Sequence, residues 1–273
     1  MRRFIIEQSD KELYTVHTGL ALVGLCLNKF TTIERRLRKR VGKCSGISHT
    51  DVLRSYVGLL SVGKSDYEAI TNKVRDEYFK RSLGIKRVPS AETLRQRMDA
   101  YADAFREVVE ESAVEVLEKA KVPVSGISTG HVPLDIDVFP MDNSNTKKEG
   151  VSRTYHNYDG YAPIAAYLGL EGWCLEAELR PGSQHSQEGF IPFLRRVLDK
   201  ARRVTEKDLL VRLDSAHDAV ETRVELEGRR GVYYVLKWNP RRNNKAKIAS
   251  LVFKEGKVEE PRPGKRVGIL KVR

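Results

Sequence analysis

Cysteine is scarce in this sequence of 273 residues, and the patterns that would mark a disulfide framework or a structural zinc site are missing. Only Cys26, Cys44 and Cys174 occur, without a C-x-x-C pair and without a histidine at ligand spacing. This usage of cysteine is typical of a protein of the reducing cytoplasm.

Long hydrophobic runs are missing as well. The longest, from Gly19 to Leu27, is much shorter than the ~20 residues that span a bilayer. Charged residues at positions 10–12 precede it, which is unlike a signal peptide. A hydrophobic content of 40% with 32% charged residues excludes wholesale disorder and collagen-like structure. We therefore expect a soluble, cytoplasmic, globular chain without a membrane span.

Acidic residues are in deficit, with 37 Asp and Glu against 49 Lys and Arg, for a net charge of +12. Most of the excess lies in residues 229–273, where fourteen Lys or Arg face only three Glu residues, and a second basic cluster lies at 35–43. A solvated surface explains such clusters equally well. Because Tyr233, Tyr234 and Trp238 lie within the first cluster, we favour a polyanionic partner, namely nucleic acid.

Residues 1–121 have the period of helices. Apolar residues recur every three to four positions from Leu94, which predicts one long amphipathic helix that is capped by Ser90 and ends at Lys121. Shorter helices are predicted over 13–38, 50–60 and 67–83. Helices followed by a basic run are found in DNA-binding units, although core packing explains the same period. We assign residues 1–121 to a helical region and predict that it binds DNA.

After Pro123 the period changes to that of strands. Strands are predicted over 133–139, 161–168, 173–179, 209–213 and 232–237, and helices over 187–203 and 219–227. The order β-β-β-α-β-α-β describes an α+β or α/β fold with a mixed sheet covered by helices. In that sheet the first and fourth strands can end side by side. We assign residues 122–273 to this second region, with 229–273 as its basic tail.

Acidic side chains stand on two of these strands. Asp135 and Asp137 lie on the first strand, and Asp214 ends the fourth. Carboxylates brought within a few ångströms repel each other unless a cation lies between them, and oxygen ligands suit Mg²⁺ or Mn²⁺. The pattern favours phosphoryl transfer with two metal ions ~3.5–4 Å apart. Asp214 before Ser215 also fits a helix N-cap, so a structural role stays open.

The amino-acid sequence of the second region also resembles that of a known family. Residues 134–194, LLVRLDSAHD (209–218) and VYYVLKWNPR (232–241) resemble the DDE transposases of bacterial insertion sequences, in the branch called transposase DDE domain group 1. The resemblance covers about residues 10–245. It implies a ribonuclease-H-like fold and DNA transposition, in which metal-dependent cleavage at the transposon end precedes attack of the freed 3′-hydroxyl on target DNA. The implied partners are the terminal inverted repeats, target DNA and a second copy in a synaptic complex.

The same resemblance assigns two of the acids. Asp137 would be the first metal-binding acid, and Asp214, in the R-L-D-S stretch, would be the second. Phe139 replaces the hydroxyl residue that is usual two positions after the first acid, so Asp135 remains an alternative.

The third acid of the family, a glutamate on a helix beyond the fifth strand, has no counterpart here. Glu255, Glu259 and Glu260 lie in a stretch interrupted by proline and glycine. We therefore expect that the final catalytic helix is missing and that the chain is truncated. An inactive DNA-binding remnant of a transposase is the alternative to an active enzyme.

Basic residues that follow the first and fifth strands are predicted to contact DNA phosphates. They are Lys147, Lys148, Arg153, Lys237, Arg241 and Arg242. The polar turns at 156–159 and 184–187 are weaker candidates to orient DNA or metal ligands, because such residues commonly satisfy loop backbone groups.

A different enzyme class shares part of this pattern. Asp135-x-Asp137 resembles the D-x-D motif of haloacid-dehalogenase phosphatases, and Asp214-x-x-x-Asp218 resembles their distal acidic motif. In that class the first motif opens a parallel doubly wound sheet. The antiparallel hairpin predicted after residue 160 argues against the phosphatase.

Overall fold

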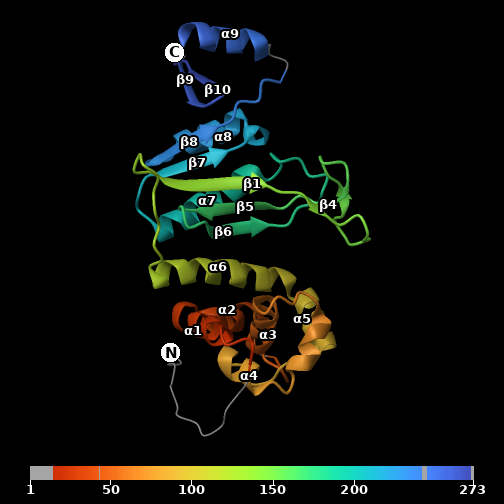
Figure 1. Ribbon diagram of the computed structural model, residues 1–273. Helices are drawn as coiled ribbons and strands as arrows, with labels where there is room; N and C mark the ends of the chain where they lie inside the picture. The colour runs from red at the N-terminus through yellow and green to blue at the C-terminus, as the bar shows by residue number, and fades with distance from the viewer. Residues whose placement is uncertain (1–14, 43, 242–244, 272–273) are drawn as a thin grey trace.

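A helical region, a five-stranded sheet and a short C-terminal unit follow one another along the chain (Figure 1). The computed structural model describes residues 15–42, 44–241 and 245–271. Arg242, one of the predicted phosphate contacts, lies outside the described residues. Within the described ranges, no helix is long and apolar enough to cross a membrane.

The helical region consists of short helices that pack around one apolar core. They are α1 (Leu20–Phe30), α2 (Ile33–Val41), α3 (His49–Ser61), the 3₁₀ helix η1 (Tyr67–Lys73), α4 (Glu77–Leu83), α5 (Ala91–Ala100) and α6 (Ala102–Ala120). Ser48, Asp76 and Ser90 each cap a helix by accepting a hydrogen bond from the backbone N–H three residues later. Gly24 lets α1 approach α4, because a Cβ there would lie 1.6 Å from the carbonyl oxygen of Ser82.

Three predicted helices of this region are divided in the structure. The long helix predicted from Leu94 to Lys121 is wrong as a single element, since Tyr101, with φ −123°, separates α5 from α6. The helix predicted over 13–38 breaks at Thr31 and Thr32, and residues 13 and 14 lie outside the described ranges. The helix predicted over 67–83 is a 3₁₀ helix and then α4, because Asp76 begins a new cap. Apolar periodicity continues across all three breaks, so it did not reveal them.

The strands of the second region form the sheet that the sequence predicts. They are β1 (Val132–Val138), β5 (Ile164–Leu168), β6 (Trp173–Glu178), β7 (Leu209–Leu213) and β8 (Val232–Leu236), in the spatial order β6-β5-β1-β7-β8. β1 is antiparallel to β5 and parallel to β7, and β7 is parallel to β8. The antiparallel β5–β6 hairpin argues against the doubly wound sheet of the phosphatase alternative. This mixed sheet is the arrangement of a ribonuclease-H-like fold.

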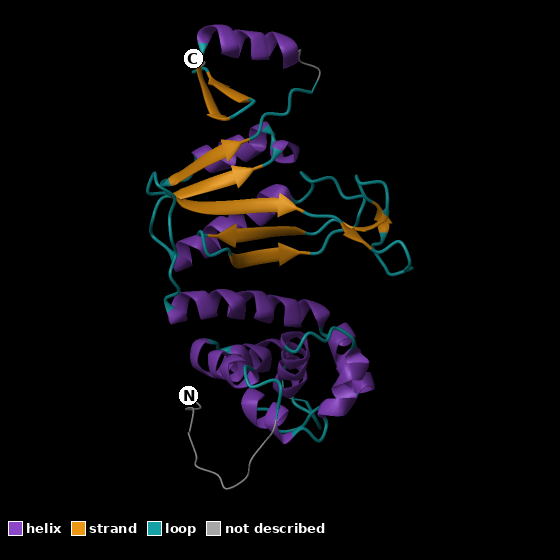
Figure 2. Cartoon of the chain, viewed as in Figure 1, coloured by secondary structure: helices purple, strands orange, loops and turns teal. Residues whose placement is uncertain are grey.

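Among the described residues, helices cover one face of this sheet (Figure 2). α7 (Phe190–Val204) and α8 (Val220–Glu227) lie behind it, and α6 runs beside β6. The core on this side joins Leu134 and Ile136 of β1 to Phe193 and Val197 of α7. On the opposite face, side chains such as Tyr233 remain exposed, and no helix of the described chain covers them.

Two further units were not predicted from the sequence. A small sheet of β2 (Met141–Asp142), β3 (Ser152–Arg153) and β4 (Asp159–Tyr161) stands at one end of the main sheet. Beyond β8, α9 (Lys245–Glu255) packs on a hairpin of β9 (Lys257–Arg262) and β10 (Lys265–Ile269). The stretch around Glu255, expected to be interrupted, therefore does contain a helix, although one that carries no buried residue.

Candidate active site at the ends of β1 and β7

Two acidic side chains meet where β1 and β7 end. The parallel register pairs Asp135 with Arg212, so Asp137 and Asp214, two residues further on, come level on strands about 4.8 Å apart. Both acids line one cavity of about 630 Å³. The topology therefore brings together two carboxylates that are far apart in the sequence.

Asp135 has a different environment from Asp137. Both of its carboxylate oxygens accept hydrogen bonds from the guanidinium group of Arg212, on the neighbouring strand. It is not among the residues that line the cavity. The structure thus places Asp137, rather than the alternative Asp135, beside Asp214.

The environment of Asp137 disfavours its charged form. Burial raises the pKa of this carboxyl group, the backbone N–H of Val138 lowers it at 2.8 Å from Oδ1, and the negative charge of Asp214 raises it further. The net effect is a pKa above the ordinary value. No residue in the described ranges donates a hydrogen bond to its Oδ2. A cation between the two acids would relieve this repulsion.

Asp214 has a structural role in addition to its place in the cavity. Its Oδ1 accepts a hydrogen bond of 3.0 Å from the backbone N–H of Ala216, which caps a short 3₁₀ helix, η2 (Ser215–His217). The capping role anticipated from the sequence is thus real, and it uses one carboxylate oxygen. Among the described residues no donor contacts Oδ2.

The segment that follows Asp214 is held from two sides. Asp218 is buried, and its carboxylate accepts a hydrogen bond of 2.8 Å from the backbone N–H of Asn239, just beyond β8. The side-chain amide of Gln187, before α7, donates to the carbonyl oxygens of Ala216 and Asp218, at 3.1 and 3.4 Å. These bonds fix the backbone that carries Asp214.

A buried histidine lies beneath the same segment. The ring of His217 is fully buried and stacks on Phe190, with centroids 4.0 Å apart. Within the described chain neither ring nitrogen has a hydrogen-bond partner. Burial lowers the pKa of His217 to about 4, so the imidazole is neutral at physiological pH and packs as an apolar group.

The small sheet forms another wall of the cavity through Arg153, Thr154 and Tyr155. It docks tightly on the loop after β6, where Gly182 permits the contact because a Cβ would lie 2.2 Å from the carbonyl oxygen of Ser152. Ser152 Oγ also accepts a hydrogen bond from the backbone N–H of Ser183. The strands of this wall could not be predicted from the sequence, because they are only two or three residues long.

The predicted phosphate contacts differ in position. Arg153 lines the cavity, 3.6 Å from Asp159, and most of its side chain is exposed. Lys147 and Lys148 are exposed and have no ion-pair partner in the described part of the chain. Lys237 is exposed just after β8. The guanidinium group of Arg241 instead donates to the carbonyl oxygen of Asp218, at 2.8 Å, so it supports the loop behind Asp214.

Among the described residues, no third acid lines this cavity. Glu255, Glu259 and Glu260 lie in the C-terminal unit, apart from the five-stranded sheet (Figure 1), and none of them lines the cavity. The described residues contain no group of three or more His, Cys, Asp or Glu side chains that could hold a metal ion. Mg²⁺ is commonly held by one or two carboxylates with water and substrate phosphates, so the pair fits one divalent ion.

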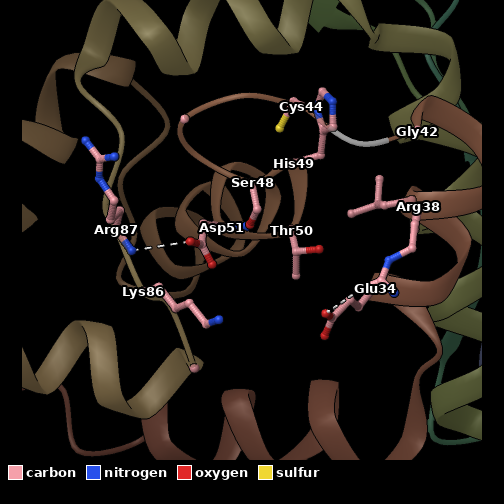
Figure 3. A pocket seen from close by; sticks show the side chains of 13 residues that line it. Glu34, Arg38, Gly42, Cys44, Ser48, His49, Thr50, Asp51, Lys86 and Arg87 are labelled. Atoms are coloured by element: carbon pink, nitrogen blue, oxygen red, sulfur yellow. Dashed lines mark hydrogen bonds and ion pairs between the residues drawn. The ribbon is translucent and has the colours of Figure 1, made fainter.

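A second cavity, in the helical region, uses its polar groups to stabilise the fold (Figure 3). Asp51 accepts a hydrogen bond of 3.3 Å from the backbone N–H of Arg87, and Glu34 forms an ion pair of 3.5 Å with Arg38. His49 is buried and lies 3.4 Å from a guanidinium nitrogen of Arg97. Glu34 is thus paired with a cation, whereas neither Asp137 nor Asp214 has an ion-pair partner among the described residues.

The family model for the transposase DDE domain group 1 matches residues 28–262, which is most of the chain. The chain belongs to this family of DDE transposases. The match includes both strands that carry Asp137 and Asp214, and it extends through α2–α6 into the C-terminal unit. A comparison with curated proteins gave no match.

Solved structures of other transposases are also similar to the chain. One is the piggyBac transposase synaptic complex with hairpin DNA, at 14% identity and TM-score 0.38, covering 88% of this chain and 54% of that one. Another is the Mos1 transposase paired-end complex with the left transposon end, at 12% identity and TM-score 0.27, covering 81% and 78%. This DDE transposase domain thus spans about half the length of the piggyBac chain.

Proposed function

We propose that this chain is a DNA transposase that binds transposon ends and catalyses metal-dependent strand cleavage and transfer. The observation that carries the proposal is the pairing of Asp137 with Asp214 at one cavity, in a chain that belongs to the DDE transposase family. Two carboxylates that face each other without a basic partner suit a divalent cation. Their location at the ends of parallel strands is where α/β sheets bind ligands.

In this proposal Asp137 and Asp214 hold Mg²⁺ or Mn²⁺ through their oxygens. An ion held there would supply Lewis-acid stabilisation of the charge that develops at a DNA phosphate. Gln187, Asp218 and Asn239 keep the backbone of Asp214 in place through the hydrogen bonds described above. Arg153, at the mouth of the cavity, orients the scissile strand through its phosphates.

DNA is held mainly through charge. Lys147 and Lys148, in the loop between β2 and β3, and Lys237, after β8, place cations near the same end of the main sheet. In the helical region, Arg35 and Lys39 of α2 are exposed and have no ion-pair partner among the described residues, whereas Arg36 is bound to Glu111 and Glu115. The regions 1–121 and 122–273 would then share the DNA, and binding should weaken steeply with salt.

The decisive experiment measures nicking of supercoiled DNA in Mn²⁺ by the wild-type chain and by Asp137→Asn, Asp214→Asn and Asp135→Asn variants. We expect the first two variants to lose nicking by about a thousandfold or more, because each removes half of the cation site. Asp135→Asn is the matched control, with the same change on the same strand but outside the cavity, and it should retain most activity. Salt-dependent DNA binding should survive in all three variants.

The alternative function is DNA binding without catalysis. It is favoured by one observation, that no third acid lies among the described residues at the cavity. In that case the wild-type chain binds DNA with a steep salt dependence but does not nick it in either metal. Equal loss of binding and nicking in Asp214→Asn would instead assign this residue a role in folding alone.

A further inference from the structure

An aromatic turn opens onto the cavity that holds the two acids. Tyr155 lines this cavity together with Asp137 and Asp214, and 65% of its surface is exposed. The ring of His156 lies beside it, with centroids 4.3 Å apart and planes inclined by 37°. His156 also lies parallel to Tyr158, within 5°, at a centroid distance of 6.0 Å. Three rings therefore follow one another, and the first of them lines the cavity.

The backbone holds this turn in one conformation. The N–H and Oγ1 of buried Thr154 both donate to the carbonyl oxygen of Tyr158, at 2.9 Å each. Asn157 takes a left-handed conformation, with φ +66°, and its N–H donates to the carbonyl oxygen of Thr154 at 3.1 Å. The hydroxyl group of Tyr158 donates to the carbonyl oxygen of Pro140, at 3.1 Å. Because the turn is fixed, a ligand that uses these rings binds without ordering the loop.

Folding does not account for the position of Tyr155. Its ring belongs to neither apolar core, and no described residue forms a hydrogen bond with its hydroxyl group. An exposed neutral ring has a π-face available for a second aromatic group.

The chemistry around the rings identifies the ligand class. A cation held by the two acids attracts a phosphate, and exposed Arg153 supplies a second positive charge two residues before Tyr155. A group that combines a phosphate with a flat aromatic ring is a nucleotide. Bases inside a duplex are stacked on each other, so only an unpaired base can reach the tyrosine ring.

We propose that Tyr155 and His156 form a stacking platform for an unpaired base of the DNA strand whose phosphate lies at Asp137 and Asp214. The proposal rests on the proposed function, since it requires DNA at this cavity. It adds a preference that the two acids alone do not supply: the chain should bind DNA with a frayed or single-stranded end more tightly than a blunt duplex.

The test compares a short duplex carrying a single-stranded tail with a blunt duplex of the same sequence, in Mg²⁺, by fluorescence anisotropy on DNA confirmed by gel to be uncut. Stacking on one ring should make the tailed DNA bind about tenfold more tightly. Tyr155→Ala should remove this preference while binding of the blunt duplex stays unchanged, and Tyr155→Phe should keep it. Tyr167→Ala is the matched control, because Tyr167 is 40% exposed and lies on β5 outside the cavity.

A direct readout of stacking uses 2-aminopurine in the tail, whose fluorescence falls when the base stacks. We expect quenching by the wild-type chain and by Tyr155→Phe, reduced quenching by His156→Ala and none by Tyr155→Ala. Equal binding of tailed and blunt DNA by the wild-type chain, or unchanged quenching by Tyr155→Ala, would overturn the stacking platform and leave the proposed function standing. A wild-type chain that binds neither DNA would overturn both proposals.

Discussion

The interface between α2 and α6 and the cavity at the ends of β1 and β7 both hold acidic side chains, in opposite environments. At the interface, the side chain of Glu115 is 6% exposed and accepts hydrogen bonds from the N–H of Thr32 at 2.8 Å, from Arg36 at 3.0 Å and from Lys119 at 3.2 Å. Burial alone would raise the pKa of Glu115, but these donors hold it at about 2. At the cavity, Asp137 faces a second acid and its pKa is raised.

The negative charge of Glu115 stabilises the fold, whereas that of Asp137 does not. Glu115 is surrounded by donors, so removing it would leave buried polar groups without a partner. Asp137 gains no stabilisation from its neighbour Asp214, whose negative charge raises its pKa. Carboxylates kept in a costly environment are characteristic of functional sites. Removal of the carboxylate should therefore destabilise the fold at Glu115 and stabilise it at Asp137.

The largest effect on stability is expected for Glu115→Gln. At neutral pH the lowered pKa of Glu115 corresponds to about 3 kcal/mol of folding free energy, which the variant should lose. Because the folded pKa is depressed, this contribution is present above the unfolded pKa of ~4.3 and disappears as the pH falls towards about 2. Urea unfolding of both proteins between neutral and acidic pH measures it. A difference in the free energy of unfolding between the two proteins that does not change with pH would contradict this role of Glu115.

A second prediction concerns His217, a buried group without a hydrogen-bond partner among the described residues. Its pKa is lowered to about 4, so the unfolded state takes up a proton first as the pH falls, and the wild type should lose roughly 2–3 kcal/mol between pH ~6.5 and ~4. His217→Phe should remove most of this pH dependence and remain folded on Phe190. The melting temperatures of both proteins are measured at neutral and at mildly acidic pH. An equal decrease in the two proteins would show that His217 takes up a proton in the folded state as readily as in the unfolded state.

The smallest effect is expected for Asp137→Asn without metal. Removing one of two repelling carboxylates should raise the free energy of unfolding at neutral pH by less than about 1 kcal/mol. Because the pKa of Asp137 is raised, the gain should shrink as the pH falls and the wild-type carboxyl group takes up a proton. Mn²⁺ should reverse the order, since it stabilises only the protein that binds it. Calorimetry with and without Mn²⁺ tests this, with Asp135→Asn as the control that still responds to the metal.

Much of the sheet could be predicted because its signals are local. The alternation of apolar residues in β1 and the apolar run of β7 marked both strands within about two residues, and their order fixed which strand ends meet. Asp135 and Asp137 could not be told apart in this way, because residues two apart on a strand share a face. Only Arg212, on a strand far away in the sequence, separates them by binding Asp135.

The parts that were missed depend on distant contacts. Thr32, where a predicted helix breaks, binds Glu115 across 83 positions of sequence. The small sheet has strands of two or three residues that are held by neighbours rather than by their own propensity. Tyr155, which lines the cavity, follows Thr154 in a turn without an apolar period, so its nearness to Asp137 depends on how the small sheet docks. The proposed roles of these acids and of Tyr155 remain predictions until the variants are measured.

The helix α6 has a consequence for how the chain can be divided experimentally. Its Phe105 and Val108 belong to the core of the helical region, whereas Leu117 belongs to the core beneath the sheet. Arg203 of α7 adds ion pairs to Glu111 and Glu118 on the same helix. A fragment that begins at residue 122 would therefore lack the helix that covers part of its core. A fragment that contains the five-stranded sheet should keep α6 and start near residue 102.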